Sequence, residues 1–127
     1  MLTLLIFLNV CHWLADYTML STPKMLAAKR FGTPLLPIWN HAATHGCLMG
    51  LACACLLKPT HLLTPVFAII VFETVTHFII DVLKGKMNVW YPPAANPAKT
   101  IHWTIFGFDQ LLHQIVIIII AYYATNI

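Results

Sequence analysis

Four long apolar stretches limit what this chain can fold into. They cover about residues 2–20, 35–57, 65–84 and 104–125, so each has roughly 19–23 residues. A helix of this length spans a hydrocarbon core of about 30 Å. A transmembrane β-barrel would need at least about eight strands, which this pattern does not supply. The sequence therefore predicts an all-α fold, with residues 1–127 forming one polytopic domain, a bundle of four transmembrane helices.

The composition excludes an ordinary soluble domain. Of the 127 residues, 60% are hydrophobic and only 9% are charged, whereas soluble proteins average roughly 45–50% and 25%. The net charge of +3 comes from few basic residues in connecting segments, which argues against a nucleic-acid partner. All four cysteines lie in apolar stretches and predict free thiols. The expected partner is the lipid bilayer, and a homo-oligomer is compatible with the sequence.

The basic residues predict an orientation. The second connection contains Lys58 alone, whereas the first and third share six basic residues, namely Lys24, Lys29, Arg30, Lys84, Lys86 and Lys99. The positive-inside rule places those two connections in the cytoplasm and both termini outside, and we expect a bacterial inner membrane. Residues 21–34 are expected to include a short surface helix, and residues 58–64 a tight turn with Thr64 as the next N-cap.

The second apolar stretch carries a stripe of small residues. They are spaced four apart, at Ala42, Gly46, Gly50 and Ala54. Such a stripe allows a neighbouring helix to approach closely, so we expect a helix–helix contact along it.

Each predicted helix also carries one pair of His or Asp residues spaced four apart. Random placement of the His and Asp residues would give about 0.8 such pairs. The i, i+4 spacing puts both members of a pair on one helix face. The four pairs are His12 with Asp16, His41 with His45, His77 with Asp81, and Asp109 with His113.

The predicted orientation places all four pairs in one layer near the cytoplasmic side. A carboxylate in a membrane helix costs about 2.5–3.5 kcal/mol on the insertion scale, so several of them need compensation. Imidazole and carboxylate groups are common ligands of Zn, Mn and Fe. We therefore predict that all eight residues bind one or two divalent ions, most simply Zn. Four further residues are expected around these ligands, namely Glu73, Lys84, Asn40 and Gln110.

Two alternatives remain open from the residues alone. The His and Asp side chains would also satisfy one another by hydrogen bonds between helices, or form a proton or ion pathway without a bound metal. His61 and His102 lie in connections and are expected at the membrane interface. Cys53 and Cys55 lie away from the polar layer and are not counted as ligands.

The ordered motifs resemble a known family. They read HxxxD at 12–16, HxxxH at 41–45, HxxxDxxK at 77–84 and DQxxH at 109–113. This set resembles a family of small bacterial and phage membrane proteins known only as a domain of unknown function, over nearly the whole chain. Where that family tends to have Gln four residues after the first Asp, this chain has Leu20. A more distant resemblance is to membrane-bound metal-dependent hydrolases induced with the DNA-damage response.

These observations favour a membrane-embedded metal-dependent hydrolase. The expected substrate is a lipid, or an amphiphile with a phosphate or ester near the headgroups. Asp16 or Asp109 is the expected catalytic base. The alternatives are a metal or proton transport or binding protein, a non-catalytic membrane factor with a structural metal site, and a di-iron oxygenase.

Overall fold

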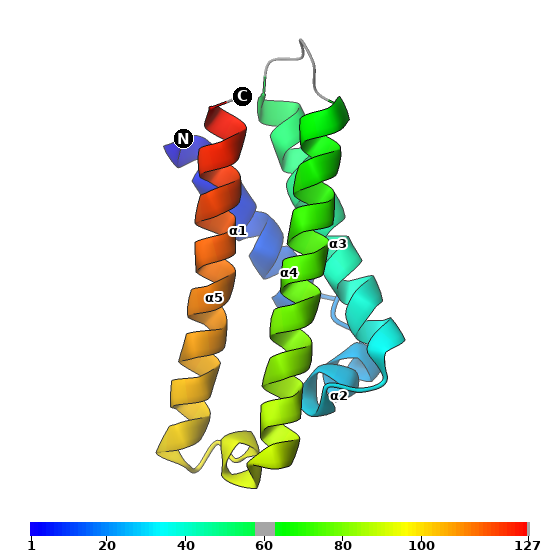
Figure 1. Ribbon diagram of the computed structural model, residues 1–127, viewed down its shortest axis with the longest axis vertical. Helices are drawn as coiled ribbons and strands as arrows, with labels where there is room; N and C mark the ends of the chain where they lie inside the picture. The colour runs from blue at the N-terminus through cyan, green and yellow to red at the C-terminus, as the bar shows by residue number, and fades with distance from the viewer. Residues whose placement is uncertain (58–62, 127) are drawn as a thin grey trace.

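The computed structural model describes residues 1–57 and 63–126, and every extended element in these ranges is helical (Figure 1). No strand occurs in them, so the predicted all-α fold is confirmed. The elements are α1 (Leu2–Tyr17), α2 (Pro23–Phe31), α3 (Leu35–Leu56), α4 (Leu63–Trp90), the short 3-10 helix η1 (Pro92–Ala95) and α5 (Thr100–Thr125).

The helix α4 is the centre of the arrangement, because it packs against α2, α3, α5 and η1. The shorter α1 packs against α3 and α5. Both described chain ends lie at one end of the molecule, whereas α2 and the α4–α5 connection lie at the other (Figure 1). We call these the terminal end and the α2 end. The six basic residues of the first and third connections thus belong to the α2 end.

Two helices, α4 and α5, are long and apolar enough to cross a membrane. The apolar α1 has 16 residues, a length of about 24 Å against a hydrocarbon core of about 30 Å. It was expected to reach residue 20 but ends at Tyr17, because the Ser21 hydroxyl donates to the carbonyl oxygens of Ala15 and Asp16. The bundle of four membrane-spanning helices stays a prediction.

The other helix ends differ from expectation mainly in α4. This helix begins at Leu63, so Thr64 lies inside it instead of capping it, and it continues to Trp90 instead of residue 84. Pro92 and Pro93 follow its end, and proline cannot extend a helix hydrogen-bond ladder. The helix α5 begins at Thr100, four residues early. The turn expected at 58–64, with Lys58 and His61, falls mostly outside the described residues.

The expected short helix in the first connection is confirmed as α2. The Thr22 hydroxyl accepts a hydrogen bond from the backbone N–H of Met25 at 3.2 Å, and Pro23 occupies the first helical position. At the other end Gly32 has a φ of 64°, the left-handed conformation that commonly terminates a helix. Both signals are local, which explains why this helix is readable from sequence.

An apolar cluster of buried residues fills the bundle toward the terminal end. It draws on four helices and consists of Leu4, Leu8, Met49, Ala52, Cys53, Ile69, Val116, Ile117, Ile120, Ala121 and Ala124. The four cysteines are free, as expected. The bundle therefore has one apolar end, and its buried polar residues are left for the α2 end.

The contact between α3 and α4 depends on the small-residue stripe. A Cβ atom added to Gly46 would lie 2.7 Å from the carbonyl oxygen of Ile70, and one added to Gly50 would overlap the Ile70 side chain. Ala42 is buried in the same region, whereas Ala54 is exposed and lies outside the contact. The expected close approach is thus present at Gly46 and Gly50.

We predict that Gly46→Ala lowers the free energy of unfolding by about 1–3 kcal/mol, since the added methyl group would clash with the α4 backbone. The control is Gly107→Ala in α5, where an added Cβ meets nothing within 4 Å. That substitution is expected to stabilise the helix by about 0.5–1 kcal/mol. Unfolding in mixed micelles with rising denaturing detergent measures both values. Equal effects of the two substitutions would contradict the close packing.

Candidate metal centre

All eight residues of the four pairs meet in one buried cluster toward the α2 end. The helices α1, α3, α4 and α5 each contribute one pair. The five histidines and Asp81 and Asp109 are at most 4% exposed, and the Asp16 side chain is 7% exposed. Because each pair is spaced i, i+4, one helix face suffices to direct both of its side chains inward.

One half of the cluster is already connected through a lysine. The ammonium of Lys29 lies 3.0 Å from Asp16 Oδ1, 3.2 Å from His41 Nε2 and 3.1 Å from Asp81 Oδ2. His41 Nε2 also lies 3.0 Å from Asp16 Oδ1 and 3.2 Å from His45 Nε2. A positive charge thus sits between two buried carboxylates.

Lys29 was expected from the sequence only as one of the basic residues that predict the orientation, and its place in the cluster was not predicted. Lys29 lies on the separate nine-residue helix α2, so no helical period relates it to the four pairs. The side chain of Lys29 is 15% exposed, whereas its neighbours Lys24 and Arg30 are exposed. The sequence carries no signal that singles out Lys29 among these three basic residues.

A glycine contact fixes α2 against α4 and so places Lys29. A Cβ atom added to Gly85 would lie 2.6 Å from the Cα of Gly32. Beyond this contact, the Asn88 side-chain amide donates to the Arg30 carbonyl oxygen at 3.1 Å. Gly85 follows Asp81 by one helical turn, so the close approach brings Lys29 within reach of the Asp81 carboxylate.

Electrostatics keep this lysine charged. Burial alone would lower the pKa of Lys29, but the carboxylates of Asp81 and Asp16 outweigh it and raise the pKa above its ordinary value. The ammonium therefore acts as a permanent cation at the edge of the cluster.

The other half of the cluster has polar atoms without partners. His77 Nε2, Asp81 Oδ1 and His113 Nε2 are buried and make no hydrogen bond within the described part of the chain. His77 Nε2 lies 3.4 Å from Asp81 Oδ2, and His113 Nε2 lies 4.0 Å from Asp81 Oδ1. These three residues form a group whose possible ligand atoms all lie within 4.8 Å of one another. We call His77, Asp81 and His113 the triad.

Both triad histidines are oriented by their other ring nitrogen. His77 Nδ1 lies 3.3 Å from Glu73 Oε1, and His113 Nδ1 lies 2.8 Å from the carbonyl oxygen of Asp109. Each oxygen accepts a hydrogen bond from Nδ1–H, which leaves the Nε2 lone pair directed at the triad. Metal-binding histidines in proteins are typically held in this way.

Two further groups of the cluster have compatible spacing. One combines His12, His45, Glu73 and His77, and the other combines Asp16, His41, His45 and His77. His77 belongs to all three groups, so it is central to every arrangement. The structure therefore contains buried His, Asp and Glu side chains that could hold a metal ion, as the sequence predicts. The identity and number of ions stay predictions.

Three of the four residues expected around the ligands contact them. Glu73 is 2% exposed and contacts His77. Gln110 donates to Asp109 Oδ2 at 3.1 Å, and Lys84 Nζ lies 3.8 Å from the same oxygen. The fourth, Asn40, is exposed, and its backbone carbonyl oxygen accepts a hydrogen bond from the Thr44 hydroxyl at 2.9 Å.

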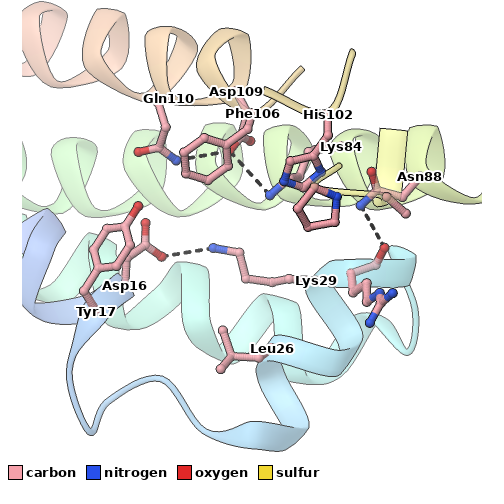
Figure 2. Close-up of a pocket in the computed structure, with 13 residues that line it drawn as sticks. Asp16, Tyr17, Leu26, Lys29, Lys84, Asn88, His102, Phe106, Asp109 and Gln110 are labelled. Atoms are coloured by element: carbon pink, nitrogen blue, oxygen red, sulfur yellow. Dashed lines mark hydrogen bonds and ion pairs between the residues drawn. The ribbon is translucent and has the colours of Figure 1, made fainter. Parts of the chain in front are cut away.

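A cavity of about 460 Å³ opens beside the cluster at the α2 end (Figure 2). Figure 2 shows Lys29 extended toward Asp16 on one side and Lys84 toward Asp109 on the other. The walls combine charged with apolar and aromatic side chains, namely Asp16, Tyr17, Leu26, Lys29, Arg30, Lys84, Asn88, Ala95, Pro97, His102, Phe106, Asp109 and Gln110. The buried cluster is therefore bordered by a space large enough for a small polar group.

A family model described as "Protein of unknown function (DUF3307)" matches residues 4–127. The chain belongs to the DUF3307 family. The expected membership in a family of unknown function is thereby confirmed, whereas the more distant resemblance to membrane hydrolases stays a prediction. Neither the curated proteins nor the solved structures compared with this DUF3307 protein gave a match.

For this DUF3307 protein we predict that His113→Ala and Asp81→Ala abolish the binding of stoichiometric divalent metal. Glu73→Gln is expected to weaken binding about 10–100-fold, because it loosens the orientation of His77. The control is His102→Ala, since His102 Nδ1 bonds to the Ala94 carbonyl oxygen, away from the triad. Elemental analysis of purified variants measures the result. Metal lost equally with His102→Ala, or retained by Asp81→Ala, would contradict the assignment.

Proposed function

We propose that this chain is an integral membrane protein and a metal-dependent hydrolase that acts on a lipid or an amphiphilic phosphate or ester. The observation that carries the proposal is the triad. Two oriented imidazoles and one carboxylate, each with an unpartnered buried atom, converge there. They lie next to Lys29 and Asp109, which line a cavity with further cationic side chains.

The outer surface supports a membrane location. Large apolar side chains are exposed along the outer faces of the long helices, for example Leu51, Phe67, Val71, Ile118 and Ile119. A surface of this kind is unfavourable in water and favourable against lipid chains. Together with the two helices long enough to span a bilayer, this favours the four-helix membrane bundle. The basic α2 end then faces the cytoplasm of a bacterial inner membrane, with both termini outward.

The ligand set suits hydrolysis. Three protein ligands leave a coordination position for water, as in catalytic zinc sites, whereas structural sites use four. A divalent ion in such a site activates water for attack at neutral pH. The donor set fits Zn and is also compatible with Mn or Fe.

Among the two candidate bases, Asp109 has the better geometry. Asp109 Oδ1 is buried and makes no hydrogen bond within the described residues, and Asp109 borders the cavity. Asp16 is engaged instead, because its carboxylate contacts Lys29, His41 and His12. A carboxylate that accepts a proton from water needs a free oxygen. Asp109 Oδ1 is such an oxygen, and it lies 3.9 Å from Nδ1 of the triad residue His113.

The cavity favours an amphiphilic substrate with an anionic or ester headgroup. Arg30 and Lys84 supply positive charge at its wall, and Leu26 and Phe106 supply apolar surface. A phosphate or carbonyl oxygen would find charged donors there, while an attached acyl chain would remain in the bilayer.

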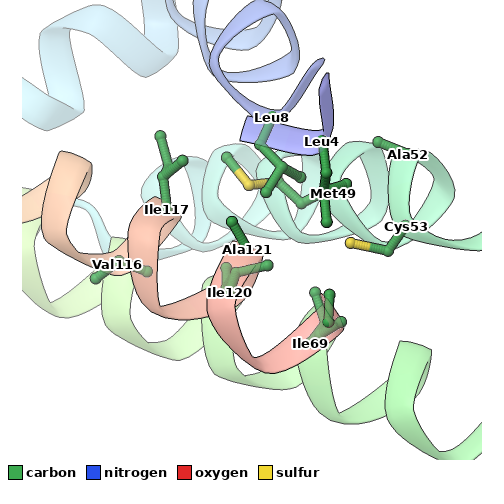
Figure 3. Packing of buried hydrophobic residues seen from close by; sticks show 11 residues of the cluster. Leu4, Leu8, Met49, Ala52, Cys53, Ile69, Val116, Ile117, Ile120 and Ala121 are labelled. Carbon is green, nitrogen blue, oxygen red and sulfur yellow. The ribbon is translucent and has the colours of Figure 1, made fainter. Parts of the chain in front are cut away.

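Transport across the membrane is the weaker alternative. A metal or proton path would have to continue from the cluster toward the terminal end. The apolar cluster occupies the bundle on that side, with Leu8, Met49 and Ile117 packed between the helices (Figure 3). Within the described residues, no charged side chain is buried in this apolar cluster.

We predict metal-dependent hydrolysis when the purified protein is given vesicles or micelles containing phospholipids, lipid phosphates and acyl esters. Asp109→Asn should retain the metal and lose about 10²–10⁴-fold in turnover, because it removes the proton acceptor. Lys99→Ala, at an exposed position outside the cavity, serves as the control. Product release is followed by mass spectrometry before and after chelation. Turnover that survives complete metal removal would contradict the proposal.

A further inference from the structure

The cluster offers donor groups for more than one divalent ion, and Lys29 bears on how many it holds. We propose that the ammonium of Lys29 occupies the place of a second metal ion, so that the protein binds a single divalent ion, at the triad. This inference rests on the proposed metal site and determines its composition.

The contacts of Lys29 are those expected of an ion. Its ammonium lies 3.0–3.2 Å from Asp16 Oδ1, His41 Nε2 and Asp81 Oδ2, two carboxylate oxygens and one imidazole nitrogen. The contacts with Asp16 and His41 are hydrogen bonds, and the contact with Asp81 is an ion pair. Asp16 and His41 are members of a group with metal-compatible spacing, so Lys29 lies against atoms that a metal would otherwise use.

The distribution of unpartnered atoms separates the two halves of the cluster. The buried side-chain atoms without a hydrogen-bond partner in the described chain belong to the triad and to four other residues of the cluster. They are Nε2 of His77 and of His113, both oxygens of Asp81, both ring nitrogens of His12, His45 Nδ1, Glu73 Oε2 and Asp109 Oδ1. Neither Asp16 nor His41 contributes such an atom. The Asp16 and His41 atoms that contact Lys29 are therefore satisfied by the protein itself, whereas the unpartnered atoms lie in the triad, in Asp109, and in the adjacent His12, His45 and Glu73, a group that shares His77 with the triad.

The charge balance leads to the same number of ions. Counted by formal charge, the buried cluster holds the three carboxyl groups of Asp16, Glu73 and Asp81, while Asp109 lies 3.8 Å from the ammonium of Lys84. Lys29 and one divalent ion supply three positive charges, while metal-bound histidines are neutral. A second divalent ion would leave an excess of two positive charges in a buried site, which is strongly unfavourable.

The position of Lys29 is built into the fold. The contact between Gly32 and Gly85 holds α2 against α4, and an added Cβ at Gly85 would collide with backbone atoms of α2. Lys29 also borders the cavity, so its charge faces the space where the proposed substrate headgroup would lie. It therefore holds a fixed cation against ligand atoms that a second ion would otherwise use.

The test is the metal stoichiometry of purified protein in detergent, equilibrated with Zn²⁺ or Mn²⁺ and freed of excess ion. Wild-type protein is expected to bind one ion per chain. Lys29→Ala is expected to bind two, because it exposes Asp16 and His41 as ligands. Lys29→Arg, which keeps the charge, and Lys24→Ala, an exposed position on the same helix, should each bind one. With Mn²⁺, electron paramagnetic resonance should show an isolated ion in wild type and a coupled pair in Lys29→Ala.

The outcomes separate this inference from the proposed function. Two ions in the wild type, or one ion in folded Lys29→Ala, would overturn the inference and leave the metal site intact. No ion in the wild type would overturn both. If Lys29→Ala fails to fold without metal, its thermal stability should be restored by Zn²⁺ more than that of Lys24→Ala, and equal responses would count against the inference.

Discussion

The structure depends on the cost of burying carboxylates in an apolar bundle. Asp81 and Glu73 are almost completely buried, and Asp16 is nearly so. Such groups are tolerated only when cations and hydrogen bonds compensate their loss of hydration. Lys29 provides part of this compensation, and the triad atoms without partners indicate where the remainder has to come from. The proposed metal ion would thus compensate the buried carboxylates and stabilise the fold, in addition to activating water.

The two ends of the bundle differ in the side chains that they bury. Toward the terminal end, apolar side chains and the glycine contacts of α3 with α4 hold the helices together. Toward the α2 end, the same helices carry the polar cluster, and α2 closes it through the contact between Gly32 and Gly85. A rigid apolar end keeps the four pairs in register, which a ligand set drawn from separate helices requires. The cavity beside the cluster would then allow a substrate to approach the proposed metal site.

The sequence predicted what is periodic or local. The i, i+4 pairs predicted one inward face per helix, and the structure brings all eight residues together. A short helix was expected in residues 21–34, and α2 forms there with local caps at Thr22, Pro23 and Gly32. What could not be predicted depends on contacts between distant segments. The role of Lys29 follows from the approach of α2 to α4. The exposed position of Asn40 follows from the packing of its helix. No local sequence pattern encodes either contact. The helix α4 also continues to Trp90, beyond the predicted residue 84, and packs against α2.

The most direct test of the central claim is X-ray absorption spectroscopy of the zinc-loaded protein. The account predicts a first shell of nitrogen and oxygen only, at about 2.0–2.2 Å, with the outer scattering of two imidazole rings. Substitution of His77 or His113 should remove one ring from that signal. A sulfur shell at about 2.3 Å would place the ion on cysteines and contradict the account, as would a zinc ion bound without imidazole.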